Sequence, residues 1–169
     1  PVPPPPLTDA ELLAPVSRFG RVLRAVGVGR GDRVVIYLPW VPGASAAMLA
    51  CATFGSVPSF VFGGFAPGEL AARIEDATPK VVVIASCGIE PKRVVPYKPM
   101  LDAAIERSTH KPDHCIVLQR EQSPAEMGPR DLDWSVLMDP ATGTNSESVA
   151  VEATAPPRLL HPPGTTARP

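Results

Sequence analysis

The chain has few of the residues that mark specialised architectures. Aromatic residues make up only 5% of its 169 residues, and its three cysteines follow neither a CxxC pattern nor a zinc-ligand spacing. We therefore expect reduced, intracellular thiols, with neither a disulfide framework nor a zinc site. No apolar run approaches the roughly 20 residues that a membrane-spanning helix requires.

The chain also lacks an excess of charge of either sign. Its 16 basic and 17 acidic residues give a net charge of −1, which excludes a general attraction to nucleic acid or to an anionic membrane. Its first residues, PVPPPP, have neither the apolar stretch of a signal peptide nor the Arg-rich pattern of a transit peptide. They predict a polyproline arm over residues 1–6, which is either an unpacked end or a ligand for a proline-binding domain.

Apolar and chain-breaking residues are abundant instead. Hydrophobic residues make up 44% of the chain, enough for one domain with a sizeable core, and 23 prolines and 13 glycines supply many breaks. A capping-box pair, Thr8 and Glu11, precedes apolar residues at helical spacing as far as Val26. The patterns predict three further helices at residues 42–51, 67–78 and 97–108, and strands at residues 32–38, 59–62, 80–85 and 114–118.

This alternation of helices and short apolar strands predicts βαβ units, a parallel sheet and an α/β fold over residues 7–120. We expect residues 86–96 to form a loop. Residues 121–169 are expected to be an irregular tail with a short helix near residues 134–138, because the final segment is rich in proline and has no periodicity. We interpret Trp40 and Trp134 as packing groups, and His110 and His114 as surface or helix-end histidines.

Several segments carry family-specific patterns. The densest are GRGDRVVIYLP (residues 29–39) and MLACATFGSVPSFVFGGF (residues 48–65), joined by GIEPKRVVPYK (residues 88–98) and HKPDHCIVL (residues 110–118). Over residues 12–138 the chain resembles the acetyl- and propionyl-CoA synthetases of the adenylate-forming (ANL) superfamily, and in the last two segments the short-chain family member 3 type. The resemblance implies a partial N-terminal subdomain of that fold. Full-length members make an acyl-adenylate from ATP and a short-chain carboxylate and then transfer the acyl group to CoA.

Paired glycines occur in the motif VFGGF, residues 61–65. Glycines at such a place either make a tight turn or allow backbone amides to approach a phosphate. The motif is not GxGxxG, so it does not indicate a dinucleotide-binding fingerprint. The resemblance implies that Phe62 and Gly64 lie beside the nucleotide of CoA.

A second candidate CoA contact is the loop formed by Glu90, Pro91, Lys92 and Arg93. Acetyl-CoA synthetases have Arg-Gly-Gly-Lys at this place, in a loop that contacts the CoA nucleotide. Here Glu90 and Pro91 depart from the pattern, while Lys92 and Arg93 retain the cations that suit phosphate oxygens. A solvated charge pair is the alternative interpretation of these side chains.

The last residues, HPPGTTARP (161–169), resemble the signature YTSGTTGRPKG, whose hydroxyls and glycine amides hold the phosphates of ATP. The retained residues are Gly164, Thr165, Thr166 and Arg168. Two prolines at residues 162–163 remove hydroxyls and amide donors, and Ala167 replaces a glycine. We interpret the segment as a degraded ATP phosphate loop that does not bind phosphate productively.

The function that the resemblance implies is therefore incomplete. In the family, the acyl pocket, the Mg²⁺-associated acidic motif and the adenylation lysine follow the phosphate loop, so we expect the isolated chain not to be catalytic. Two alternatives are a non-catalytic module that binds CoA or another subunit, and a chain that folds poorly and has no function. The resemblance favours a mitochondrial matrix location, with the cytosol as the alternative.

Overall fold

The computed structural model describes residues 8–91, 93–139 and 148–161. The helices are α1 (Asp9–Ala25), α2 (Pro42–Phe54), α3 (Pro67–Ala77), α4 (Tyr97–Arg107) and α5 (Trp134–Leu137). The strands are β1 (Arg33–Tyr37), β2 (Val57–Phe60), β3 (Val81–Ala85), β4 (Cys87–Glu90), β5 (Arg93–Pro96), β6 (His114–Leu118) and β7 (Asp131–Asp133). The predicted polyproline arm lies outside the described residues.

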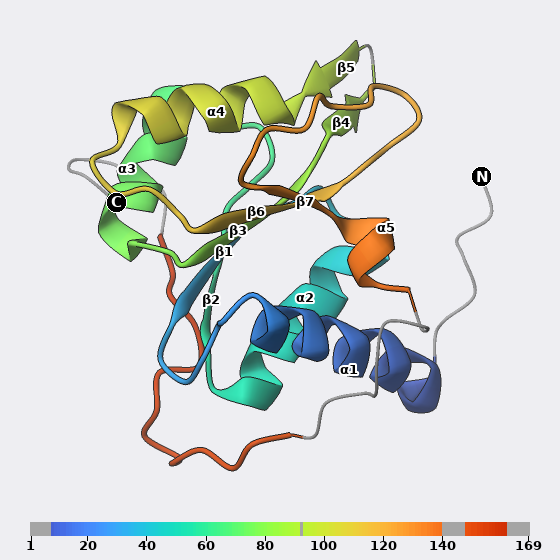
Figure 1. Cartoon of the computed structure of the whole chain (residues 1–169), viewed down its shortest axis with the longest axis vertical. Helices are drawn as coiled ribbons and strands as arrows, with labels where there is room; N and C mark the ends of the chain where they lie inside the picture. Colours follow the sequence, from blue (N-terminus) through green and yellow to red (C-terminus); the bar gives the residue numbers. More distant parts are fainter. Residues whose placement is uncertain (1–7, 92, 140–147, 162–169) are drawn as a thin grey trace.

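The described elements form three layers around a parallel sheet. Five strands lie in the order β2-β1-β3-β6-β7, and every pair of neighbours is parallel. Helices α1 and α2 cover one face of the sheet, and α3 and α4 cover the other (Figure 1). The side chains of β1 and β3 between these layers are mostly β-branched, and all except Arg33 are buried. The predicted α/β fold with a parallel sheet is confirmed.

Local sequence explains where the first helices begin and end. Thr8 and Glu11 form the predicted capping box of α1, in which the Thr8 amide donates to the Glu11 carboxylate at 2.8 Å. Helix α2 buries four small side chains against the sheet: Ala44, Ala46, Ala47 and Ala50. It ends at Gly55, whose positive φ of 67° suits a residue without a Cβ.

Three of the sequence predictions for this fold were wrong. Residues 86–96 are largely an antiparallel hairpin of β4 and β5, not a loop. The strand predicted at residues 59–62 is observed at Val57–Phe60 instead. It includes Pro58, which is tolerated there because β2 is an outer strand in the order of the five-stranded sheet. Residues 131–133, expected to be part of the irregular tail, form β7 and extend the sheet, while the predicted short helix is present as α5.

Candidate functional site

The segments that follow β1, β2 and β3 leave the sheet at its carboxyl edge. The chain passes from β1 to β2 in one direction and then crosses back to β3, so the strand order reverses at β1 (Figure 1). Open parallel sheets bind ligands at such a switch point, beyond the carboxyl ends of the strands. Residues 61–65 follow β2 and the β4–β5 hairpin follows β3, so both segments expected to face CoA start at this edge.

Residues 62–65 form a tight turn at the end of β2. The Gly64 amide donates to the Phe62 carbonyl at 2.8 Å. The Tyr37 hydroxyl, at the end of β1, donates to the Phe65 carbonyl at 3.2 Å and ties the turn to the sheet. The Phe62 side chain is 60% exposed, and its ring lies edge-on to that of Phe65. The tight-turn interpretation is confirmed, and Phe62 and Gly64 lie on the accessible side of the turn.

Tyr97 joins this turn to the hairpin, and sequence reasoning missed it. Its ring packs against that of Tyr37, with centroids 4.9 Å apart. A Cβ built on Gly63 would lie 2.5 Å from the Tyr97 hydroxyl, and one built on Gly88 would overlap the same hydroxyl. Both glycines therefore make room for one buried tyrosine. Glycines in two separate motifs were the available signal, but only the fold shows that they share a neighbour.

The hairpin carries the second group of candidate residues. Glu90 pairs with Arg93 in the strand register, and the Arg93 Nε donates to the Glu90 carboxylate at 2.8 Å. This hydrogen bond and the charge of Glu90 raise the pKa of Arg93. Pro91 is exposed in the turn, and Lys92 lies outside the described residues. Because the Arg93 side chain is 71% exposed, it can exchange Glu90 for a phosphate at little cost in desolvation.

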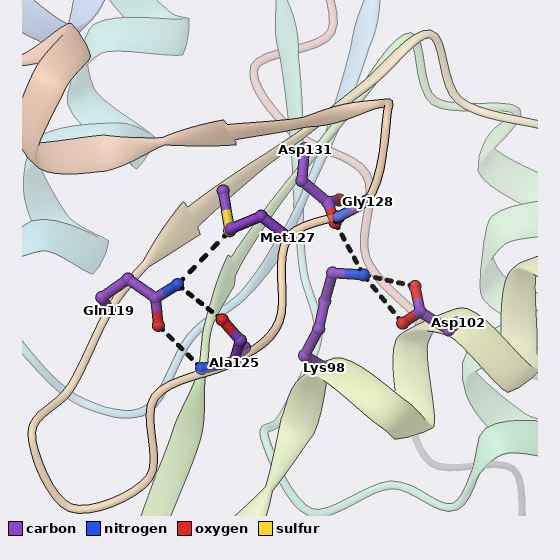
Figure 2. Close-up of polar contacts among 7 residues, drawn as sticks. All are labelled: Lys98, Asp102, Gln119, Ala125, Met127, Gly128 and Asp131. Carbon is purple, nitrogen blue, oxygen red and sulfur yellow. Dashed lines mark hydrogen bonds and ion pairs between the residues drawn. The ribbon is translucent and has the colours of Figure 1, made fainter.

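An ion network fixes the start of α4 to the first residue of β7 (Figure 2). The Lys98 Nζ lies 2.6 Å from Asp102 and 2.8 Å from Asp131, whose carboxylate also accepts from the Gly128 amide at 2.6 Å. Burial opposes the charge of Lys98, but hydrogen bonds to Asp102 and Asp131 outweigh it, so the pKa of Lys98 is raised. The Asp131 Oδ1 is buried and has no hydrogen-bond partner.

The loop before β7 is held at its other end by Gln119. Its amide nitrogen donates to the Ala125 carbonyl at 3.0 Å, and its oxygen accepts from the Ala125 amide at 2.9 Å (Figure 2). Arg120, the next residue, donates to the Cys87 carbonyl at 3.1 Å. The base of the hairpin is therefore fixed to the segment that follows β6.

The segment 148–161 starts beside the end of α2, where the Val149 amide donates to the Thr53 carbonyl at 2.8 Å, and ends beside β2 and α3. The Leu159 amide donates to the Pro58 carbonyl at 2.9 Å, in a parallel bridge to Ser59. His161 lies between Ser59, 3.1 Å from its Nδ1, and Asp76, 2.9 Å from its Nε2. The predicted phosphate-loop residues follow directly and lie outside the described residues: Gly164, Thr165, Thr166, Ala167 and Arg168.

A surface cavity of about 530 Å³ lies between α3, the end of α4 and His161. Its charged groups are largely paired. The Glu75 carboxylate accepts hydrogen bonds from Ser108, Thr109 and the His110 amide, which lower the pKa of Glu75 to about 2. The cavity is lined by two basic and two acidic side chains, so it favours neither a positively nor a negatively charged ligand.

The remaining singled-out residues have structural positions. The Trp134 ring stacks on Phe19 at 4.5 Å, which confirms its packing role. Trp40 stacks on Phe60 but is 82% exposed, so its interpretation as a packing group was wrong. The His110 Nε2 contacts the Pro79 carbonyl at 2.7 Å, and His114 lies on β6, so neither lies at the carboxyl edge.

All three cysteines lie in the interior of the described structure. Cys51, Cys87 and Cys115 are buried and unpaired, and burial raises the pKa of Cys51 and of Cys115 to about 12. Within residues 8–91, 93–139 and 148–161 no group of three His, Cys, Asp or Glu side chains is placed to hold a metal ion. None of the helices in this part of the chain is long and apolar enough to cross a bilayer.

Known proteins match this chain over most of its length. The family described as AMP-binding enzyme matches residues 6–169. An uncharacterized protein of Pseudomonas aeruginosa is 52% identical over 91% of the chain. The mitochondrial acyl-CoA synthetase short-chain family member 3 of Rattus norvegicus is 44% identical over 97% of the chain, and the propionate–CoA ligase of Escherichia coli is 37% identical over 96%.

The chain covers 24%, 25% and 26% of these three proteins, so it spans about a quarter of the length of its curated relatives. The match nevertheless includes the whole parallel sheet and every segment at its carboxyl edge. The chain therefore belongs to the family of AMP-binding enzymes.

Proposed function

We propose that this chain is the CoA-facing N-terminal part of a short-chain acyl-CoA ligase, which joins propionate or acetate to CoA through an acyl-adenylate. One observation carries the proposal. Tyr97 brings the turn at residues 62–65 and the hairpin of Glu90 and Arg93 together at the carboxyl edge of the sheet. Relatives named as short-chain acyl-CoA synthetases and as a propionate–CoA ligase support the acyl-chain class.

The phosphates of CoA are the expected ligands of the hairpin. Arg93 offers a guanidinium that matches two phosphate oxygens, and Lys92 adds a point charge. Glu90 competes for Arg93 through the 2.8 Å hydrogen bond. The hairpin is thus a phosphate contact that binds only when the ligand displaces an internal carboxylate.

The catalytic steps belong to the full-length protein in this proposal. We assign adenylation to the part of the full-length protein that this chain does not cover, since the chain spans 25% of the length of the rat relative. The isolated chain retains CoA binding and lacks adenylation. Mitochondrial relatives support a location in the matrix, and the bacterial relatives show that the same sequence pattern also occurs outside mitochondria.

Calorimetric titration of the 169-residue chain with CoA tests the proposal. We expect measurable binding that the double variant Lys92→Ala/Arg93→Ala weakens at least tenfold, because two phosphate contacts are lost. Glu90→Gln should tighten binding several-fold, since Arg93 is released from its internal partner.

A matched control removes two positive charges at the end of the sheet where β1 and β3 begin. Arg30→Ala/Lys80→Ala changes the net charge equally, but both residues precede their strands. If both double variants lose the same CoA affinity, the loss is caused by the change in net charge, and the assignment of the hairpin as the phosphate contact is refuted. Propionate-dependent AMP release by the isolated chain would contradict the assignment of catalysis to the rest of the protein.

A further inference from the structure

The Tyr97 side chain is largely buried at the seam between the two candidate CoA segments, with its hydroxyl at the seam. Only 4% of the residue is exposed, and its ring packs on Tyr37. The hydroxyl end lies between the backbones of Gly63 and Gly88, where neither residue has a side chain to cover it. A polar atom has therefore been placed where two loops meet, at the carboxyl edge of the sheet.

This hydroxyl forms no hydrogen bond with any residue that the structure describes. Its neighbour Tyr37 differs, because the Tyr37 hydroxyl donates to the Phe65 carbonyl. The hydroxyl oxygen is not among the buried polar atoms that lack a hydrogen-bond partner, so it still touches solvent at the seam. Burial of the side chain, with the charge of Glu90 second, raises the pKa of Tyr97. At neutral pH the hydroxyl therefore keeps its proton, and no described residue competes with a ligand for that hydrogen bond.

The surroundings indicate which part of a ligand reaches it. Gly88 precedes Glu90 by two residues along β4, about 7 Å at the usual rise of a strand. The charged pair of Glu90 and Arg93 thus lies at the far end of the hairpin, and the hydroxyl lies at its base. The pair between them, Ile89 and Val94, is exposed and apolar and projects from the opposite face of the hairpin. The hairpin therefore has its charged pair at the tip and an uncharged base at Gly88.

We propose that the Tyr97 hydroxyl donates a hydrogen bond to an amide carbonyl of the pantetheine arm of CoA. This inference rests on the proposed function, because it takes the phosphates to lie at Arg93. The pantetheine arm follows the phosphates, is uncharged, and carries two amide carbonyls as acceptors. It matches the order of groups along the hairpin, with the charged pair at the tip and the neutral hydroxyl at the base.

The test compares two ligands on two proteins. Calorimetry measures the Kd of CoA, and of 3′,5′-ADP as a nucleotide without the pantetheine arm, for the intact chain and for Tyr97→Phe. Phenylalanine keeps the ring between the glycines and removes only the hydroxyl. We expect Tyr97→Phe to weaken CoA binding about tenfold and to leave 3′,5′-ADP binding unchanged.

Each other outcome overturns the inference in a distinguishable way. Unchanged CoA affinity in Tyr97→Phe refutes the role of Tyr97 and leaves the proposed function in place. Equal weakening of both ligands assigns the hydroxyl to the nucleotide or to loop structure. If the intact chain binds neither ligand, the proposed function fails as well. A denaturant titration of Tyr97→Phe should match the intact chain, which separates binding from folding.

Discussion

The two outer strands of the sheet, β2 at one edge and β7 at the other, are held by different kinds of contact. At the β7 edge, the strand register joins β7 to β6, and the buried Lys98–Asp131 pair joins β7 to α4. At the β2 edge, the segment 148–161 is joined to β2 by one backbone bridge and by His161, and to the end of α2 by a hydrogen bond from the Val149 amide to the Thr53 carbonyl. Asp131 is only 1% exposed, whereas Asp76, the carboxylate partner of His161, is 63% exposed.

This difference indicates which of the two edges can open only when the whole fold unfolds; we call that edge integral. Removing the partner of a buried charge lowers the free energy of unfolding much more than removing the partner of an exposed charge, because water cannot replace the partner of the buried charge. We therefore expect the β7 edge to unfold only with the core, and the segment 148–161 to open by itself. The candidate site at residues 62–65 and 87–97 is attached to the integral side through Lys98 and Arg120.

The largest effect is expected at Lys98. Lys98→Ala leaves Asp131 buried without its cation and should lower the free energy of unfolding by about 3–5 kcal/mol. Urea titration measures the loss. Lys80→Ala is the matched control, because its 3.7 Å pair with Asp32 is about one-third exposed and should contribute only about 0–1 kcal/mol.

A second variant separates charge burial from packing. Lys98→Met/Asp131→Leu removes both charges and keeps side chains of similar size, so it should recover most of the lost stability. If Lys98→Ala costs no more than Lys80→Ala, the β7 edge is not held by this network.

Gly88 at the base of the hairpin should give the next largest effect. Gly88→Ala places a Cβ against the Tyr97 hydroxyl, and overpacking of a buried ring costs about 1–3 kcal/mol. Gly29→Ala is a suitable control, since its Cβ would lie 3.7 Å from the nearest atom, on Asp32. A normal thermal unfolding midpoint for Gly88→Ala would show that Tyr97 is not confined between the two glycines.

A smaller, local effect is expected at the β2 edge. His161→Ala leaves the buried Ser59 hydroxyl without its partner and should weaken the local structure by about 1–2 kcal/mol. Hydrogen exchange should accelerate at the Leu159 amide and stay unchanged in β3 and β6. Equal acceleration in all three would mean that this edge is as integral as the β7 edge.

The smallest expected effect is a pH dependence from Glu75, which joins α3 to the residues after α4. Hydrogen bonds from Ser108 and Thr109 lower the pKa of Glu75 from 4.5 to about 2. A lowered folded-state pKa contributes stability above pH 4.5, and this contribution is lost as the pH falls from about 4.5 to about 2. Glu75→Gln should flatten the stability profile in that window, and an unchanged profile would contradict the assignment.

The elements with strong local patterns were predictable from sequence. The strand at His114–Leu118 was predicted with its observed bounds, and Thr8 and Glu11 marked the start of α1. Strand β7 was missed because three residues, two of them Asp, carry no apolar alternation. Its position depends on pairing with β6, which is a tertiary contact.

The candidate site was only partly predictable for a related reason. Two motifs in sequence indicated Phe62, Gly64 and the charged hairpin, and both begin at the carboxyl edge of the sheet. From sequence, Tyr97 was only the first residue of a predicted helix, and that helix is present as α4. Its role became visible only when Gly63 and Gly88, 25 residues apart in the numbering, were found on either side of its hydroxyl.

The most direct test of the account is to map CoA binding onto the chain residue by residue. Amide chemical shifts of the labelled 169-residue chain would be recorded as CoA is added. We predict that the shifts change at residues 62–65 and 87–97, with small changes at residues 148–161 and in α1. Changes concentrated along residues 148–161, or no saturable change at any amide, would contradict the assignment of the hairpin and Tyr97 as the CoA-facing site.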